Sequence, residues 1–281
     1  MIEHVTSAGV WLNEAANVAG RLLLAPIGVL PAAASLMLTA AVAGIVLLYA
    51  YKHTSCQGAI RRVRNTMKAD FLALSLFRDS IAVCLRVQVQ ILAGACRLFL
   101  HSLIPMAIMA VPTGLLLTQL GLWYQSRPLR IGEEVVVGMF LQSAPGSPWP
   151  GVELAPSPSI ELQTGPVRVL SQRALFWNLR AKTAGYHQLV FHVDGQAVEK
   201  QLAAGDAVMR VSMQRPPRKL PDILWHPAES PFPGTSAVRS IEIQYPGRTG
   251  WMIGRDRWII GWFAGSMVSA LCFRRMAGVA F

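Results

Sequence analysis

The sequence has few charged residues, and acidic residues are especially scarce. Only 15% of its 281 residues are charged, with 15 Asp and Glu against 26 Lys and Arg, while 53% are hydrophobic. An ordinary soluble protein carries about 25% charged residues. This composition argues against an ordinary soluble protein and favours the membrane class, so long uncharged runs are candidate membrane spans.

The sequence also lacks the patterns that carry catalysis or hold a cofactor. It contains no G-x-S-x-G, H-E-x-x-H, P-loop or G-x-G-x-x-G motif. His187 and His192 are five residues apart in a predicted strand, so they point to opposite faces and do not form a metal-ligand pair. We therefore expect no enzyme activity, no catalytic residue, no cofactor and no metal. The four cysteines lie outside the β-rich part and offer it no disulfide framework: Cys56, Cys84, Cys96 and Cys272.

Two uncharged runs are long enough to cross a bilayer as helices. A helix rises about 1.5 Å per residue, so about 20 apolar residues cross a hydrocarbon core of about 30 Å. Residues 29–51 form the first predicted span and residues 98–124 the second, and neither contains Asp, Glu, Lys or Arg. The second ends on Trp123 and Tyr124, an aromatic pair typical of the headgroup boundary.

A third span is predicted over residues 251–273. Its uncharged part, from Trp258 to Phe273, covers only 16 residues. Residues 251–253 lengthen it if the charged residues at 255–257 pair or lie at the interface. A short tail, residues 274–281, would follow it.

The positive charge is concentrated between the first two spans. Residues 52–97 hold eight Lys and Arg against two Asp. Basic loops stay in the cytoplasm, so this connector and the tail with Arg274 and Arg275 are predicted to be cytoplasmic. The N-terminus and residues 125–250 are then outside a cell (inner) membrane. Because the charge lies beside spans, anionic lipid rather than nucleic acid is the expected partner. The residues expected to contact anionic lipid or a client are Arg61, Arg62, Arg64 and Lys68.

The connector, residues 52–97, is predicted to form a helical hairpin. One helix should cover about 57–77 and the second about 80–97, continuing into the second span, because Asp79 or Ser80 is a good N-cap. A single amphipathic helix lying on anionic lipid is the alternative. The apolar three-four repeat consists of Ile60, Val63, Met67, Leu74, Phe77, Ile81, Cys84, Gln88 and Ile91.

The first 28 residues are predicted to contain a helix lying on the outer membrane surface. Apolar residues from Val10 to Leu22 recur at helical spacing, and Trp11 would anchor the helix. A plain exposed or docked helix is the alternative, and Pro26 should end it. No basic segment precedes the apolar run, so we do not interpret it as a secretory signal peptide.

Residues 125–250 read as a β domain. About seven short β-rich runs are separated by Gly, Pro, Ser and Asp, a spacing that suggests an immunoglobulin-like sandwich. Asp194-Gly195 predicts a two-residue hairpin turn, and Trp177 is the expected core aromatic residue. The proline-rich segment 214–235 contains Ile223 to Trp225, which would rest on the outer membrane surface.

Polar side chains inside the predicted spans allow two interpretations. One is hydrogen bonding between helices, the usual role of small polar residues in bundles. The other is a wet groove open to the cytoplasm, lined near the cytoplasmic end of residues 98–124 and opened by proline bends. The candidate groove residues are His101, Ser102, Pro105 and Pro112.

The order of these elements resembles the three-helix core of the YidC/Oxa/Alb insertase superfamily. The resemblance is carried by residues 59–112, AIRRVRNTMKADFLALSLFRDSIAVCLRVQVQILAGACRLFLHSLIPMAIMAVP, and above all by the hairpin leading into Ser102–Met106. It implies a groove that shields polar parts of a client and a cytoplasmic hairpin that receives the client. Bacterial members usually carry an arginine in the first span and rarely an inserted sandwich, and this chain differs in both respects.

The resemblance therefore predicts an α+β membrane protein with three spans that helps insert or assemble other membrane proteins. The alternative is a non-catalytic accessory subunit of a larger membrane complex, which would dock its partners through the extracytoplasmic β-sandwich. Other membrane proteins are the expected partners in either case.

Overall fold

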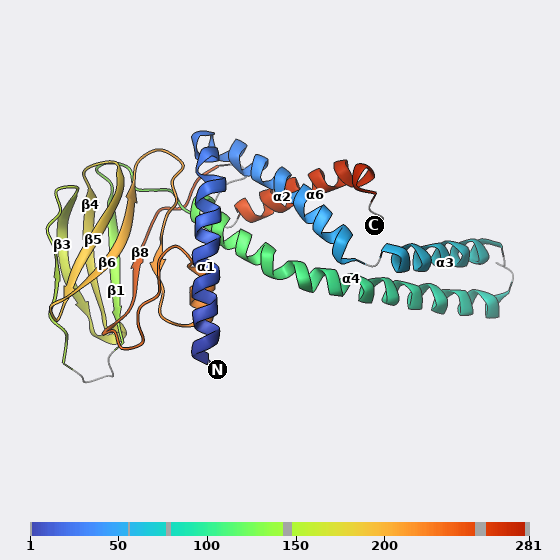
Figure 1. Cartoon of the computed structure of the whole chain (residues 1–281), viewed down its shortest axis with the longest axis horizontal. Helices are drawn as coiled ribbons and strands as arrows, with labels where there is room; N and C mark the ends of the chain where they lie inside the picture. The colour runs from blue at the N-terminus through green and yellow to red at the C-terminus, as the bar shows by residue number, and fades with distance from the viewer. Residues whose placement is uncertain (1, 56, 77–79, 143–147, 251–256, 279–281) are drawn as a thin grey trace. The chain divides into compact units, whose positions relative to one another are not determined.

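The computed structural model in Figure 1 describes residues 2–55, 57–76, 80–142, 148–250 and 257–278. It confirms the α+β class, with long helices and antiparallel sheets. The chain divides into two compact units, which we treat separately. The β unit comprises Met1–Leu36 and Leu115–Gly261, and the helical unit comprises Met37–Gly114 and Trp262–Phe281.

Within the described residues, two helices are long and apolar enough to cross a membrane: α2, Ala32–Thr54, and α4, Ile81–Tyr124. They contain most of the first predicted span and all of the second. Only 6% of the most apolar stretch of α4 is buried, against 39% for α2. The core helix of a soluble protein would be mostly buried, and the low burial of α4 differs from that.

The third span stays a prediction. Helix α6 covers Arg257–Ala277 and is not among the two helices that pass by length and composition. Residues 251–256, which would begin this span, lie outside the described residues.

Helices α3, Gln57–Leu76, and α4 form the predicted antiparallel pair in the helical unit (Figure 1). The inward-facing residues that the apolar repeat predicted for α3 are correct, and these residues form the predicted seam of that helix. Ile60 is buried, and Val63, Met67 and Leu74 are half-buried. Gly94 of α4 lies so close to Met67 that a Cβ there would approach the Met67 Cγ to 2.7 Å. The predicted break at residues 77–79 lies outside the described residues.

The predicted seam of α4 is wrong at two positions. Ile81 and Gln88 are exposed, whereas the predicted Cys84 and Ile91 are half-buried. Val87, which the predicted repeat did not include, is buried. The repeat was continued across the break between the helices, but the rotational register of a new helix restarts at its own first residue.

Helices α2 and α6 pack through small residues inside the helical unit. Ala40 is fully buried, and a Cβ added to Gly44 would overlap the backbone carbonyl of Ser266. The Ser269 hydroxyl donates a hydrogen bond to the Ala41 carbonyl at 2.9 Å. Close backbone approach at small residues, with serine bonds between helices, is typical of helix pairs in membranes. Ser269, a polar residue of the predicted third span, thus makes a hydrogen bond between two helices.

We predict that Gly44→Ala destabilises the helical unit, because the added methyl must push α2 and α6 apart. Gly114→Ala in α4 is the matched control, since no described residue lies within 4 Å of a Cβ placed there. Alanine favours a helix over glycine by up to about 1 kcal/mol, so the control should be neutral or stabilising. Thermal unfolding in mild detergent, followed by helical circular dichroism, measures both. Equal melting temperatures for the two variants would contradict the close packing.

The β unit contains two antiparallel sheets around one hydrophobic core. The strand order is β3-β4-β1-β8-β7 in one sheet and β2-β5-β6 in the other. Trp177 is 1% exposed, and its ring lies 5.0 Å from that of Phe191 in the opposite sheet, so the predicted core aromatic residue is confirmed. The immunoglobulin-like assignment stays a prediction. The strands are β1 Glu134–Leu141, β2 Val152–Leu154, β3 Ile160–Val169, β4 Ala174–Ala181, β5 Gly185–Val193, β6 Gln196–Ala204, β7 Gln214–Arg215 and β8 Val238–Ile243.

The predicted hairpin turn joins β5 and β6. Asp194 and Gly195 have φ values of 47° and 83°, and Val193 pairs with Gln196 across the turn. Two consecutive positive φ angles define the tight turn that suits twisted antiparallel strands, which is why Asp-Gly occupies it. The turn fixes the register of the whole β5–β6 ladder.

Helix α1, Ile2–Leu24, packs on the β unit through its small and polar side. Gly9 lies against Leu220 of α5, Leu220–Trp225, and the Asn13 side chain donates to the Ile223 carbonyl at 2.5 Å. The predicted apolar face points away, because Trp11, Val18 and Leu22 are 70%, 60% and 72% exposed. Helix α1 ends before the short 3-10 helix η1, Pro26–Val29, as expected for Pro26.

Candidate functional site

The predicted groove residues all lie on α4, which continues as one helix through both prolines. His101 and Pro112 are exposed, Ser102 is half-buried and Pro105 is buried. The Ser102 hydroxyl donates to the Leu98 carbonyl at 3.0 Å, so it is satisfied within its own helix. The groove itself stays a prediction.

The predicted lipid-contacting cations lie on α3 with free access from solvent. Arg61, Arg62, Arg64 and Lys68 are all exposed. Three of them, at positions i, i+3 and i+7, share one helical face. Arg61 also donates to the Gly278 carbonyl at 3.2 Å. Their contact with anionic headgroups stays a prediction.

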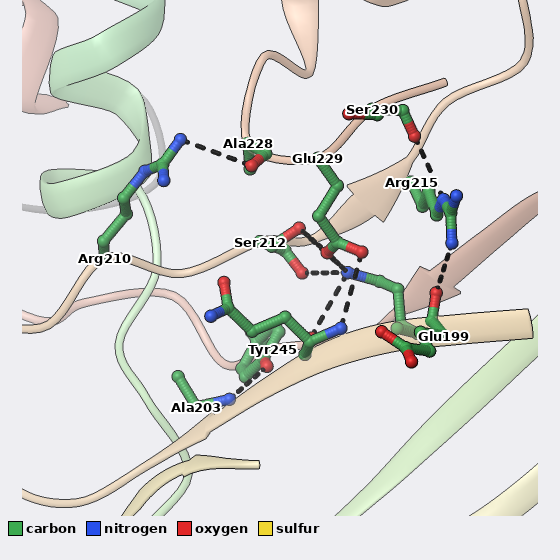
Figure 2. A network of polar contacts seen from close by, with 11 residues as sticks. Glu199, Ala203, Arg210, Ser212, Arg215, Ala228, Glu229, Ser230 and Tyr245 are labelled. Carbon is green, nitrogen blue, oxygen red and sulfur yellow. Dashed lines mark hydrogen bonds and ion pairs between the residues drawn. The ribbon is translucent and has the colours of Figure 1, made fainter. Parts of the chain in front are cut away.

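A buried lysine in the β unit forms the most distinctive polar site of the described chain. Lys200 of β6 is fully buried, and its ammonium donates to the Glu229 carboxylate at 2.5 Å and to the Ser212 carbonyl and hydroxyl at 2.7 and 2.9 Å. Figure 2 shows Ser212 and Glu229 directed at the same ammonium. The Ser212 hydroxyl donates to Glu229 in turn. Burial lowers the pKa of Lys200, and the Glu229 charge opposes that shift.

No sequence motif indicates Lys200, although the register of the predicted hairpin is enough to identify it as a buried position. The Asp194-Gly195 turn places Lys200 opposite Leu189, a buried position. Alternation along β6 then puts Lys200 on the same inward face as Leu202. A lysine at an inward position must find a buried acceptor, and that reasoning would have identified the site.

A second set of bonds joins three parts of the β unit around Asn17 of α1. The Asn17 oxygen accepts from Arg210 at 2.6 Å and from Gln119, near the end of α4, at 2.9 Å. The Asn17 amide donates to the Pro227 carbonyl at 2.6 Å. Arg210 is 5% exposed, and burial, followed by repulsion from Arg21, lowers its pKa to about 10. These contacts hold α1 and the last turns of α4 against the β domain.

A hollow of about 410 Å³ lies beside this network. Its lining mixes charges of both signs, with Arg21 and Arg215 facing Glu14, Glu199 and Glu229. The Arg215 guanidinium bonds the Glu199 and Ser230 carbonyls (Figure 2). Within the part of the chain that the structure describes, no group of three His, Cys, Asp or Glu side chains could hold a metal.

The Lys200–Ser212 pair has the composition of a serine nucleophile with a lysine base, but its surroundings suit a structural ion pair. Ser212 is 2% exposed, so a substrate cannot reach its hydroxyl. A general base must be an unprotonated amine, whereas Glu229 stabilises the charged ammonium. The arrangement therefore locks strands and loops together and gives no support to hydrolysis.

Comparisons of the chain with known protein families, with curated proteins and with solved structures find no match in any of the three.

We predict that Lys200→Met destabilises the protein by about 3 kcal/mol, because Glu229 loses its counterion in a mostly buried setting. Adding Glu229→Leu should restore most of that loss, since a buried ion pair can be replaced by apolar residues. Urea unfolding in mild detergent, followed by the β-sheet circular dichroism signal, measures this.

The exposed Arg180–Glu134 pair provides the control for the ion-pair prediction. Arg180→Met should cost far less stability than Lys200→Met, because exposed ion pairs contribute little. A single Lys200→Met variant as stable as the wild type would show that the buried pair does not hold the β unit together.

A second prediction concerns alkaline pH. Tyr245 is buried, its hydroxyl accepts the Ala203 N–H at 2.8 Å, and burial raises its pKa above the ordinary value of 10.0. A raised folded-state pKa contributes stability that is complete below the unfolded-state pKa and is lost as pH rises above it. The free energy of unfolding should therefore fall above about pH 10.

Tyr245→Phe removes the titrating group and should flatten this part of the pH profile, whatever its effect at neutral pH. The measurement is urea unfolding from pH 8 to 11.5 on both proteins. Parallel profiles for the two proteins would rule out Tyr245 as the source of the alkaline loss.

Proposed function

We propose that this chain is a multi-pass membrane protein that binds apolar segments of other membrane proteins and helps to insert or assemble them. The observation that carries the proposal is the exposed apolar surface of α4. The proposal extends the insertase resemblance of residues 59–112.

Helix α4 is too long to lie wholly inside a bilayer. Its 44 residues extend about 66 Å, about twice the hydrocarbon core of about 30 Å. The uncharged stretch from Leu98 to Tyr124 fits the core, while Arg86 and Arg97 favour an aqueous position for the preceding turns. The N-terminal third of α4 and its partner α3 would thus project from the membrane.

The part of the hairpin that would project from the membrane nonetheless exposes large apolar side chains to solvent. Leu85, Val89 and Leu92 of α4 are exposed, as are Leu72 and Leu76 of α3. Large exposed apolar patches mark sites of interaction with proteins or membranes. Continuing along α4, Leu100, Ile104 and Ile108 are exposed in the predicted span. A client leaving water for lipid would find apolar contacts along the whole path.

The basic side chains of α3 complement this surface. Arg61, Arg64 and Lys68 share a face in the first half of the helix, and the exposed leucines follow in its second half. Anionic lipid would hold the basic half at the membrane surface, leaving the apolar half to the client. The separation of basic and apolar side chains along α3 supports binding of other membrane proteins without any enzymatic step.

A second function is favoured by strand β3. It is an edge strand of ten residues, and it exposes Leu162 and Val167. A long edge strand with apolar side chains can accept a strand from another protein. This feature supports the accessory-subunit alternative, in which the β unit docks partners on the extracytoplasmic side of the membrane.

The test is site-specific photocrosslinking in cells. We expect a photoreactive residue at Leu92 to capture newly made membrane proteins, and the same residue at His192, exposed in the β unit, to capture none of them. In cells depleted of the protein, the wild type should restore the yield of client membrane proteins. A triple variant with serine at Leu85, Val89 and Leu92 should restore only a small part of that yield. A third probe at Leu162 tests the edge strand β3. If only the probes at His192 or Leu162 capture other proteins, and the triple variant restores the full client yield, client binding by the hairpin is rejected and the accessory-subunit function is favoured.

A further inference from the structure

Two neighbouring hollows lie in the β unit, where the candidate span α2 begins and the candidate span α4 ends. The first, of about 210 Å³, is lined by Arg127, Arg130 and Arg248 with Asp206 as the only acid among its lining residues. The second, of about 800 Å³, is lined mainly by apolar side chains, including Val29, Leu30 and Trp123. The two share Ala32, Asp206 and Arg248, so a cationic chamber opens beside an apolar one.

The three arginines are not equally neutralised. Arg127 makes two 2.7 Å bonds to the Glu133 carboxylate, and Arg130 lies 4.0 Å from Asp206. Arg248 donates from Nε to the Trp123 carbonyl at 3.1 Å. One of its terminal nitrogens is buried and has no hydrogen-bond partner among the described residues. Burial, with some repulsion from Arg127, lowers the pKa of Arg248.

Among the described residues, the half-buried Arg248 guanidinium has no carboxylate partner. Such a group favours an anion, because a desolvated charge is costly unless it is paired. A planar guanidinium also matches phosphate oxygens better than an ammonium does. The first turn of α2 supports the same ligand. Ala32 begins that helix and lines both hollows, and the first N–H groups of a helix lack intrahelical partners and favour negative charge.

The apolar chamber decides between a free phosphate and a lipid. A free phosphate would occupy only the cationic chamber, and Val29 would remain 90% exposed to water. A phospholipid would fill both chambers, with its phosphate beside Arg248 and its first acyl methylenes against Val29, Leu30 and Trp123. Trp123 is also the kind of residue that lies at the headgroup level.

We propose that these two hollows form one binding site for an anionic phospholipid of the outer leaflet, with Arg248 binding the phosphate. The site is distinct from the cations of α3, which are predicted to contact the cytoplasmic leaflet. This inference rests on the proposed membrane topology. A bound lipid would join α2, α4 and the loop at residues 206–208 inside the β unit.

The experiment is native mass spectrometry of the full chain in mild detergent, titrated with phosphatidylglycerol, phosphatidylcholine or inorganic phosphate. We expect one phosphatidylglycerol to bind the wild type, and Arg248→Gln to weaken that binding about tenfold, as the loss of a charge-assisted bond does. Arg239→Gln, which removes an exposed charge elsewhere in the β unit, should bind within twofold of the wild type.

Two further variants keep the test decisive. Arg248→Lys retains the charge and should show intermediate binding even if Arg248→Gln does not fold. Val29→Gln should weaken lipid binding if the acyl chain uses the apolar chamber. Displacement of the lipid by millimolar inorganic phosphate, or full binding by Val29→Gln, would overturn the lipid assignment. Equal binding by wild type and Arg248→Gln would overturn the site.

Cysteine labelling of intact cells separates failure of this site from failure of the proposed function. Asn65→Cys and Asp194→Cys should react from opposite sides of the membrane. Reaction from the same side would overturn the topology and this inference together. If the two cysteines react from opposite sides and phosphatidylglycerol does not bind, the lipid site alone is overturned.

Discussion

The β unit depends on one buried charge pair. Lys200 enters the core from an inward position of β6, where an ammonium is tolerated only because Glu229 and Ser212 surround it. Glu229 lies in the segment after α5, so this pairing fixes that segment on the sheet. Helix α1 contacts α5 through Asn13 and the segment after α5 through Asn17. One ion pair thus supports the surface on which the N-terminal helix docks.

Local patterns predicted the features that are determined locally. Asp194-Gly195 specified its hairpin because few residues adopt two successive positive φ angles, and Trp177 was identified from the apolar run around it. The helices α3 and α4 followed from three-four periodicity and from Asp79 or Ser80, which predict the start of a helix. The long uncharged runs predicted the two candidate spans, since composition over about 20 residues is itself the signal.

Contacts between segments that are far apart along the chain could not be predicted from the sequence. Arg210 and Asn17 are 193 positions apart, and no periodicity links them. The side of α1 that faces the β unit is its small and polar side, the reverse of a soluble amphipathic helix, so its apolar pattern predicted the exposed face and not the docked one. The candidate groove residues were selected by residue type within one helix, and their burial differs because each faces a different direction.

The border between the two units falls inside α4, between Gly114 and Leu115. Just before this border, Pro112 removes one backbone hydrogen bond. No residue that the structure describes lies within 4 Å of a Cβ placed on Gly114. A helix bends at least cost where both features coincide. Bending of α4 would therefore concentrate at residues 112–114, and the helical turns on either side of them would stay straight.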